Sequence, residues 1–177
     1  MRSCFHKSTK VQVLGQGSVS LEEVQTGQRI RVAEGRYEPV AIKVTHSDSH
    51  LKEAFNITFM RDNGELRSLI LTTDHYLHIH KEESQVHQHI PSREVGLGDK
   101  LRLDGGKSGV IVFIERLSFP VRDLVNIYTP SGTFLANGDI VASCKSELDG
   151  SEIFTPLLGP CFDYLSESLP QRLSDLS

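Results

Sequence analysis

The sequence predicts an all-β domain made of two related halves, followed by a short extension. Short runs rich in Val, Ile, Thr and aromatic residues alternate with Gly, Asn, Asp and Ser, the usual pattern of strands joined by turns. No stretch before residue 145 keeps a long helical period. One segment of the first half recurs in the second. A chain of 177 residues, 38% hydrophobic and 24% charged, can form one folded domain with its own core.

Runs of β-branched and aromatic residues bounded by turn residues predict ten strands. They are Lys10–Leu14, Gln28–Val32, Val40–Val44, Phe55–Met60, Leu69–Thr73, Lys100–Leu103, Val110–Ile114, Leu124–Thr129, Thr133–Leu135 and Ile140–Ser143. Asp62-Asn63-Gly64 predicts a tight hairpin turn. Gly105-Gly106 and Pro130-Ser131-Gly132 predict further turns.

The internal repeat relates residues 21–32 to residues 92–103. Four positions are identical at an offset of 71, namely Glu23/Glu94, Val24/Val95, Gly27/Gly98 and Arg31/Arg102. Asn56-Ile57 recurs as Asn126-Ile127 at an offset of 70. Two copies are too few for a solenoid. We therefore prefer a duplication with an internal pseudo-twofold over chance similarity between two turns.

The last thirty residues or so differ from the rest, because they are acidic and rich in proline. Three apolar residues there have helical spacing and stop at Pro170, namely Phe162, Leu165 and Leu169. We expect a β domain at 4–147, an extension at 148–177 that can form a short helix, and a remnant of an upstream segment at 1–3.

Composition excludes several classes of protein. The net charge of −4 and the lack of a basic run argue against nucleic-acid binding. The longest apolar run, Val110–Ile114, is too short to cross a bilayer, and the first residues lack the apolar segment of a signal peptide. Cys4, Cys144 and Cys161 are too few for a disulfide framework. We expect a monomer.

Five histidines lie close together in the sequence and raise the question of a metal site. They are His75, His78, His80, His87 and His89. His78 and His80 would share one face of a strand. No pair of cysteines accompanies them, and a structural zinc site needs a specific set of three or four ligands. No metal site and no cofactor are therefore expected.

Three features carry residues suited to chemistry. Cys4 lies near the start, and Thr72-Thr73-Asp74-His75 follows an apolar run at the point where a strand should end in a loop. Gly132-Thr133-Phe134-Leu135-Ala136-Asn137 comes late and is followed by Ala142-Ser143-Cys144. Taken singly, each has an ordinary structural interpretation.

Together, in this order and spacing, the three features resemble the carboxy-terminal autoprocessing domain of hedgehog proteins and the wider Hint group, which includes inteins. The resemblance covers about residues 4–147. It implies the all-β Hint fold with its internal pseudo-twofold, which the repeat suggests independently.

The resemblance also implies a reaction at the Ser3–Cys4 bond. Cys4 would attack the carbonyl of Ser3 and form a thioester; the thiol is held covalently beside its target, and a thiol is easily ionised. His75 would protonate the departing nitrogen, which is typically worth ~10²–10⁴ in rate. Thr72 would hydrogen-bond and polarise the peptide.

In hedgehog domains, the upstream polypeptide passes from the thioester to a sterol. The resemblance implies a sterol, another lipid alcohol or water as second substrate here, and the upstream polypeptide and the lipid as partners. A base nine residues before Phe55 would be His46, with Asp48 as the alternative. The extension would bind the lipid through an apolar set, namely Phe154, Leu157, Leu158, Phe162, Leu165 and Leu169.

Two further residues are candidates for the active site. Asp123 matches an aspartate that lies near the nucleophile of inteins, and a surface turn carboxylate is an equal alternative. Cys144 is expected near Cys4, where it could form an inhibitory disulfide. Because Cys144 stands where inteins end in Asn, complete splicing is not expected. Ser3 departs from the usual Gly of the family.

Two other functions stay open. A cysteine hydrolase with a Cys4–His75 dyad could act on external substrates, and a Hint module could serve only in binding or folding. Self-cleavage could also end in hydrolysis alone. The hedgehog resemblance implies the secretory pathway and the lumen of the endoplasmic reticulum.

Overall fold

Strands joined by turns make up the regular structure of this protein. The computed structural model describes residues 4–81 and 87–146. Within these residues there is no α-helix, and the only helical elements are four short 3-10 turns, η1 (Ala33–Gly35), η2 (Ser92–Glu94), η3 (Asp104–Gly106) and η4 (Val121–Asp123). No helix among the described residues is long and apolar enough to span a membrane. The prediction of an all-β fold is confirmed.

Most strands belong to one sheet of eleven, in the order β14-β15-β9-β11-β12-β7-β8-β1-β13-β6, with β10 paired to β9. Its strands are β1 (Phe5–His6), β6 (Ile42–Val44), β7 (Leu51–Met60), β8 (Leu66–Thr72), β9 (His75–His80), β10 (His87–Pro91), β11 (Lys100–Arg102), β12 (Ser108–Pro120), β13 (Leu124–Tyr128), β14 (Thr133–Ala136) and β15 (Ile140–Ser146). A second sheet has the order β3-β2-β4-β5. Its strands are β2 (Lys10–Val13), β3 (Gly17–Ser20), β4 (Arg29–Arg31) and β5 (Tyr37–Pro39).

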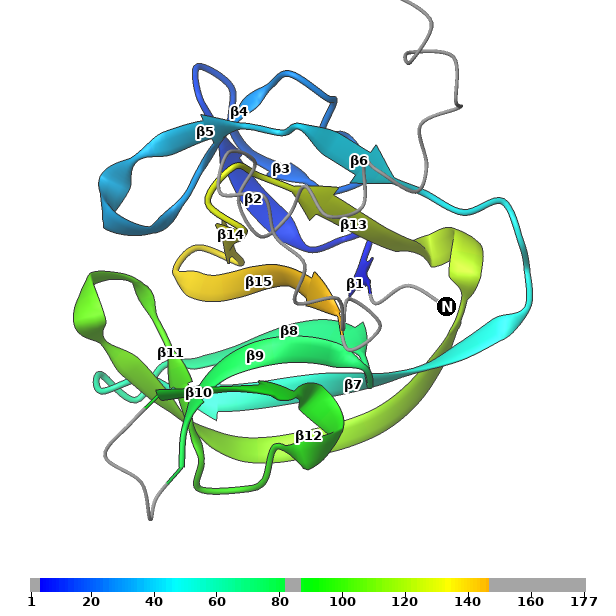
Figure 1. The fold of residues 1–177 in the computed structure, drawn as a ribbon. Coiled ribbons are helices and arrows are strands. Elements are labelled where there is room, and N and C mark those ends of the chain that lie inside the picture. The colour runs from blue at the N-terminus through cyan, green and yellow to red at the C-terminus, as the bar shows by residue number, and fades with distance from the viewer. Residues whose placement is uncertain (1–3, 82–86, 147–177) are drawn as a thin grey trace, which may run out of the picture.

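The strands are arranged in an upper and a lower part with two strands between them. Figure 1 shows β2 to β6 and β13 above, β7 to β12 below, and β1 and β15 in the middle. The large sheet curls from one part into the other, because β1 pairs with β8 on one side and with β13 on the other. This two-residue strand therefore lies at the join of the two parts.

The internal repeat appears in the backbone hydrogen bonds. The Gly27 amide donates to the Val40 carbonyl at 2.8 Å, and the Gly98 amide donates to the Ile111 carbonyl at 2.9 Å, each pair being 71 residues from its counterpart. Both glycines have positive φ, 90° and 87°, which favours glycine there. The turns η1 and η3 also recur at this offset. The duplication expected from sequence is confirmed.

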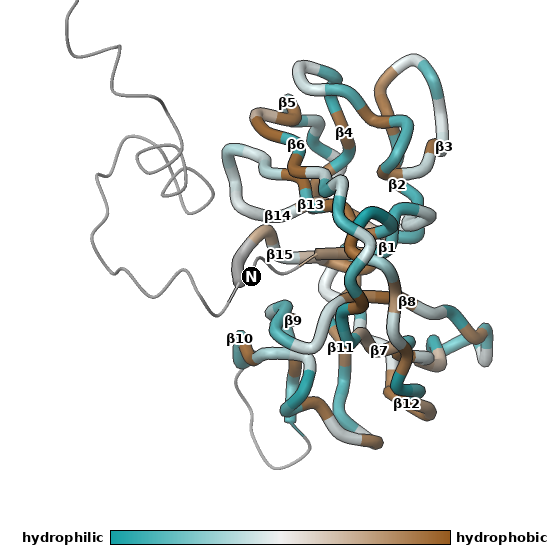
Figure 2. Tube along the Cα trace, turned by 90° about the vertical axis from the view of Figure 1, so that its right-hand side faces the viewer, coloured by the Kyte–Doolittle hydropathy of each residue, from teal (hydrophilic) through white to brown (hydrophobic). Residues whose placement is uncertain are grey.

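The core draws on both halves of the chain. Apolar segments concentrate where the strands of the two parts meet, and polar segments lie toward the outer turns (Figure 2). The largest fully buried side chains are Phe5, Phe59, Phe134, Leu21, Ile30, Ile57, Leu69, Leu71, Leu77, Ile79, Leu101 and Leu103. Each half thus covers apolar surface of the other, as expected of a duplicated domain with one core.

All ten expected strands overlap observed strands, and the hairpin turn at Asp62-Asn63-Gly64 lies between β7 and β8. Sequence patterns missed β1, β3, β5, β9 and β10. Strands β3 and β5 contain Gly, Ser, Glu and Pro, which have low strand propensity, and pairing with β2 and β4 holds them extended. The long strand β12 continues to Pro120 because β7 pairs with it as far as Leu51.

We predict that Gly109→Ala destabilises the fold, because a β-carbon at Gly109 would overlap the ring of Phe59, which is fully buried. Overpacking of this kind costs about 1–3 kcal/mol. The matched control is Gly96→Ala, whose β-carbon would lie 3.8 Å from the Asp99 carboxylate, an ordinary contact. Urea unfolding of the two variants measures the difference. Equal stability of both would show that Phe59 can move aside.

Candidate active site around Cys4

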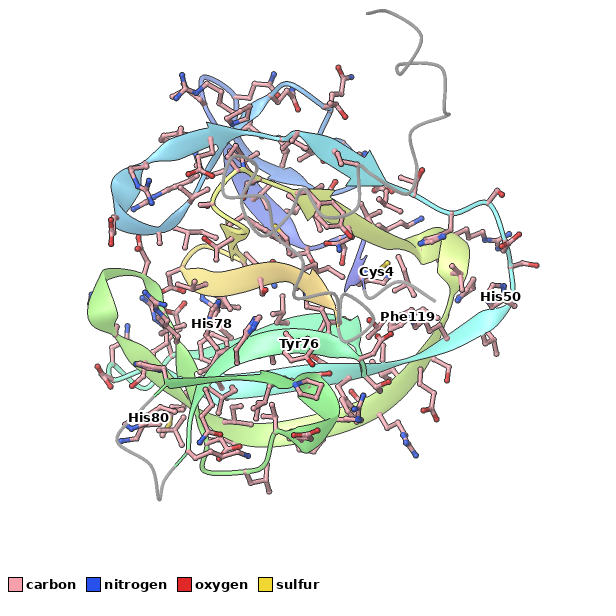
Figure 3. All side chains as sticks on the ribbon, viewed as in Figure 1. Cys4, His50, Tyr76, His78, His80 and Phe119 are labelled. Carbon is pink, nitrogen blue, oxygen red and sulfur yellow. The ribbon has the colours of Figure 1, made fainter. Side chains whose placement is uncertain are left out.

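Cys4 lies in the middle of the molecule, directly before β1 (Figure 3). Its side chain is buried, with 1% exposed. The next residue, Phe5, pairs with Leu71 of β8 and with Val125 of β13, and its ring is fully buried. The nucleophile predicted from sequence is therefore held by its neighbour against the ends of two core strands.

Thr72 holds the peptide of Cys4 from both sides. The Cys4 amide, which is the nitrogen of the predicted scissile bond, donates to Thr72 Oγ1 at 2.9 Å. The Thr72 amide donates in turn to the Cys4 carbonyl at 2.9 Å. Ser92 Oγ donates to the Thr72 carbonyl, also at 2.9 Å. The two bonds from Thr72 fix the orientation of the peptide planes on both sides of the Cys4 α-carbon, and the bond from Ser92 holds Thr72 in place.

His75 is fully buried and uncharged at neutral pH. Its Nε2 lies 2.7 Å from the Ser143 carbonyl, and a carbonyl only accepts, so Nε2 carries the hydrogen. Burial lowers the pKa of His75 to about 4, although the Ser143 carbonyl and Asp74 act in the opposite direction. Its Nδ1 has no hydrogen-bond partner within the described residues. The ring packs on Phe5 at 4.1 Å, which leaves a neutral imidazole beside the residue that follows the nucleophile.

Of the two candidate bases, the structure brings His46 to the thiol. His46 Nε2 lies 3.6 Å from Cys4 Sγ, within the range of a hydrogen bond to sulfur. The side chain of Asp48 is 70% exposed and lies 4.0 Å from His50. The backbone carbonyl of Asp48 accepts from Arg122. Asp48 thus has a surface position, and His46 has the position of a base.

A buried ion pair that sequence reasoning missed lies behind Thr72. Lys52 Nζ donates to Asp74 at 3.1 Å, and both side chains are largely buried. Burial raises the pKa of Asp74, but hydrogen bonding to Thr72 and the charge of Lys52 outweigh it, so this pKa lies below its usual value. Asp74 therefore remains a carboxylate next to Thr72 and His75. The sequence signal that could have identified Asp74 is its position between Thr72 and His75 of the Thr-x-x-His motif.

Asp123 makes structural contacts. Its carboxylate lies 2.9 Å from Lys7 Nζ, and this hydrogen bond is the main reason that the pKa of Asp123 is lowered. The Asp123 carbonyl accepts from the Lys7 amide at 2.8 Å. These contacts support the alternative interpretation of a turn carboxylate, which here ties β1 to η4.

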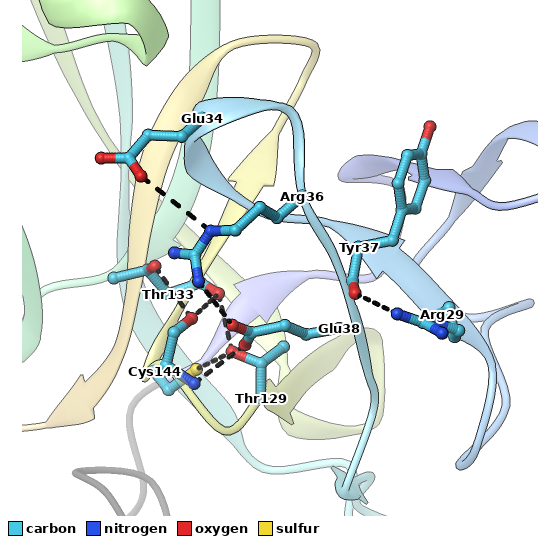
Figure 4. Close-up of polar contacts among 9 residues, drawn as sticks. Arg29, Glu34, Arg36, Tyr37, Glu38, Thr129, Thr133 and Cys144 are labelled. Carbon is cyan, nitrogen blue, oxygen red and sulfur yellow. Dashed lines mark hydrogen bonds and ion pairs between the residues drawn. The ribbon is translucent and has the colours of Figure 1, made fainter.

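Cys144 is buried, and both it and Cys4 are free thiols. Its Sγ lies 3.9 Å from Thr129 Oγ1, which itself donates to the Thr133 carbonyl at 2.7 Å (Figure 4). The Cys144 amide donates to the Gly132 carbonyl at 2.9 Å. Cys144 thus packs in the β13–β14 turn region, and a role in chemistry stays a prediction.

The remaining expected residues lie outside the described part of the chain. These are Ser3 on the acyl side of the scissile bond and the six apolar residues of the extension, Phe154, Leu157, Leu158, Phe162, Leu165 and Leu169. Among the described residues, no group of three or more His, Cys, Asp or Glu side chains is arranged to hold a metal ion.

The fold and the site together define a class of protein: a duplicated β domain that holds, through a threonine side chain, the amide nitrogen of a cysteine directly before its first strand. A family model described as Hint module matches residues 1–170. The chain therefore belongs to the Hint module family, whose domains process themselves. The finer hedgehog assignment stays a prediction.

Solved structures of similar fold are inteins and intein-like domains. The gp41-1 intein is 21% identical, with a TM-score of 0.62, covering 81% of this chain and 99% of that chain. The bacterial intein-like domain from Clostridium thermocellum is 16% identical, with a TM-score of 0.59 and coverage of 81% and 99%. No curated protein matches the chain. At these identities the likeness shows the Hint fold.

We predict that burial of neutral His75 makes the fold sensitive to acid. The unfolded chain takes up a proton near the ordinary pKa of 6.5, whereas the folded one resists until about 4. Stability should therefore fall as pH drops through this window, by about 2 kcal/mol between pH 7 and 5.

The measurement is the free energy of urea unfolding at pH 7 and pH 5, for the wild type and for His75→Gln. All other residues are the same in both proteins, so the difference in pH dependence isolates His75. If the two proteins lose equal stability on acidification, then the imidazole is not held neutral.

Proposed function

We propose that this domain cleaves the peptide bond before Cys4 through an internal thioester and passes the upstream polypeptide to a lipid alcohol, such as a sterol, or to water. The observation that carries the proposal is the clamp on the Cys4 peptide. The scissile nitrogen donates to Thr72, and the thiol of the same residue faces His46. The nucleophile and the leaving nitrogen thus belong to the same residue, and the base lies beside its thiol.

In the first step, His46 takes the proton from the Cys4 thiol, and the thiolate attacks the carbonyl carbon of Ser3. The C–N bond then breaks, and a C–S bond joins the upstream chain to Cys4 Sγ. The departing nitrogen takes a proton from His75 and becomes the free amine of Cys4. A neutral resting His75 gains this proton from water as the negatively charged intermediate forms, because a nearby negative charge raises the pKa of an imidazole. His46 returns the proton of the thiol to water, so that no proton is gained or lost overall and His46 is neutral for the second step.

In the second step, the acceptor attacks the thioester, and the upstream polypeptide leaves Cys4. An alcohol needs a base at this point, whereas a small ionised thiol does not. His46 is well placed for this as well, because it lies beside the sulfur that carries the acyl group. The apolar residues of the extension are proposed to hold the lipid.

Two observations favour transfer or hydrolysis over complete splicing and over action on external substrates. Ser143 and Cys144 stand where inteins end in His-Asn, so the side-chain amide that would cyclise is missing. Cys4 is 1% exposed and its backbone is clamped, so a foreign peptide would have to displace core contacts to reach it.

The direct test is a reporter fused before Ser3, with cleavage followed in dithiothreitol. Cleavage should occur at the Ser3–Cys4 bond, and Cys4→Ala should abolish it, because only the thiol forms the thioester. The matched control is Cys161→Ala, which removes a thiol from the extension and should cleave normally. Persistent cleavage at this bond in Cys4→Ala would disprove the mechanism.

The second test identifies the base and the acceptor, and it uses cholesterol as the offered alcohol. His46→Ala should lower sterol-dependent cleavage by ~10² or more, the usual contribution of a general base. Asp48→Ala should change it little, because this side chain points to solvent. Mass spectrometry of the released reporter identifies a sterol adduct, a dithiothreitol adduct or a free acid.

A free acid in the presence of cholesterol would show that water is the acceptor, which corresponds to hydrolytic self-cleavage. Loss of sterol transfer in Asp48→Ala with normal transfer in His46→Ala would show that the wrong base has been chosen.

A further inference from the structure

The hairpin β9–β10 carries four histidines on one face. Strand β9 alternates between buried core residues and half-buried outer ones, so His78 and His80 point to the same side. The register pairs His87 with His80 and His89 with His78 directly across the two strands. The imidazoles thus form two cross-strand pairs, one behind the other.

The rings of each pair are close. The ring centroids of His78 and His89 are 4.6 Å apart with an interplanar angle of 24°, and those of His80 and His87 are 5.2 Å apart at 48°. Within the described residues, His80 Nε2 has no hydrogen-bond partner and is shielded from solvent. Packing alone would be served by apolar or β-branched residues at these positions, and two successive imidazole pairs are an unusual choice.

An imidazole pair at this spacing suits a borderline divalent cation. Zinc binds histidine nitrogen at about 2.0–2.1 Å, so two ligand nitrogens need to be roughly 3–3.5 Å apart. Small rotations about the side-chain bonds bring nitrogens of directly opposed rings to that separation, since facing β-carbons are about 4.5–5.5 Å apart. Imidazole is a preferred ligand of zinc, nickel and copper.

The charges around the pair select among cations. Lys100 of β11 lies opposite His80, and Arg102 lies close enough to act on His87. Hard ions such as Mg²⁺ seek carboxylates and would be repelled, whereas coordination to nitrogen can outweigh a neighbouring positive charge.

We propose that the His80–His87 pair binds one divalent transition-metal ion, of the class of Zn²⁺ or Ni²⁺, through two imidazole nitrogens, with water at the other positions. The His78–His89 pair offers a second site of the same kind. No three ligands converge among the described residues, so each ion takes two protein ligands. This site is separate from Cys4 and the self-cleavage reaction.

The experiment is titration calorimetry of the full chain with NiCl₂ and ZnCl₂, on wild type, His80→Asn, His87→Asn and the control His50→Asn. His50 is an exposed histidine outside the hairpin. Each hairpin variant should weaken binding at this site by about tenfold or more, because each removes one of two ligands. His50→Asn should bind within about twofold of wild type, and dithiothreitol-induced cleavage should be unchanged in all variants.

A second measurement does not depend on variants. Paramagnetic Ni²⁺ should broaden the imidazole proton signals of His80 and His87 in the wild type before those of His50. Wild-type affinity in both hairpin variants, or broadening confined to other histidines, would overturn the proposal. Loss of binding in Cys4→Ala with full binding in wild type would overturn it too, because the thiol would then be the ligand.

Discussion

Phe5 anchors the start of the chain between β8 and β13, and the position of Cys4 depends on that anchorage. Its fully buried ring contacts Phe134 at 5.2 Å and His75 at 4.1 Å, so one side chain joins both parts of the fold to the acid of the proposed reaction. Here core packing supplies the fixed geometry that an intramolecular attack requires.

Burial gives the candidate site the properties that the proposed reaction needs, and it also lowers the stability of the fold. The low-dielectric surroundings keep His75 neutral and strengthen its bond to the Ser143 carbonyl. The same surroundings make the ion pair of Lys52 and Asp74 dependent on both partners, because either charge alone would be buried without compensation. The proposed activity and the predicted acid sensitivity thus have one physical origin.

Local patterns allowed much of the fold to be predicted. The alternation of polar and apolar residues in Lys10–Val13 predicts a strand, because successive side chains of a strand point to opposite faces. The repeated Gly27 and Gly98 predict a turn that needs positive φ. Strand β5, Tyr37–Pro39, was not predicted. Pairing with β4 keeps it extended, and the sequence of these three residues does not by itself indicate a strand.

The candidate active site was likewise predictable in part from the sequence, and the rest depends on strand pairing. The sequence by itself determined that Thr72 and His75 lie close together, because only two residues separate them, and it predicted Cys4 as the nucleophile. Only the tertiary structure shows that His46 lies beside the thiol and that the side chain of Asp48 is exposed. The contact of His46 with Cys4 spans 42 residues, and it depends on the pairing of β13 with β1 on one side and with β6, which precedes His46, on the other. Long-range strand pairing has no local sequence signal, because it depends on the register of the whole sheet.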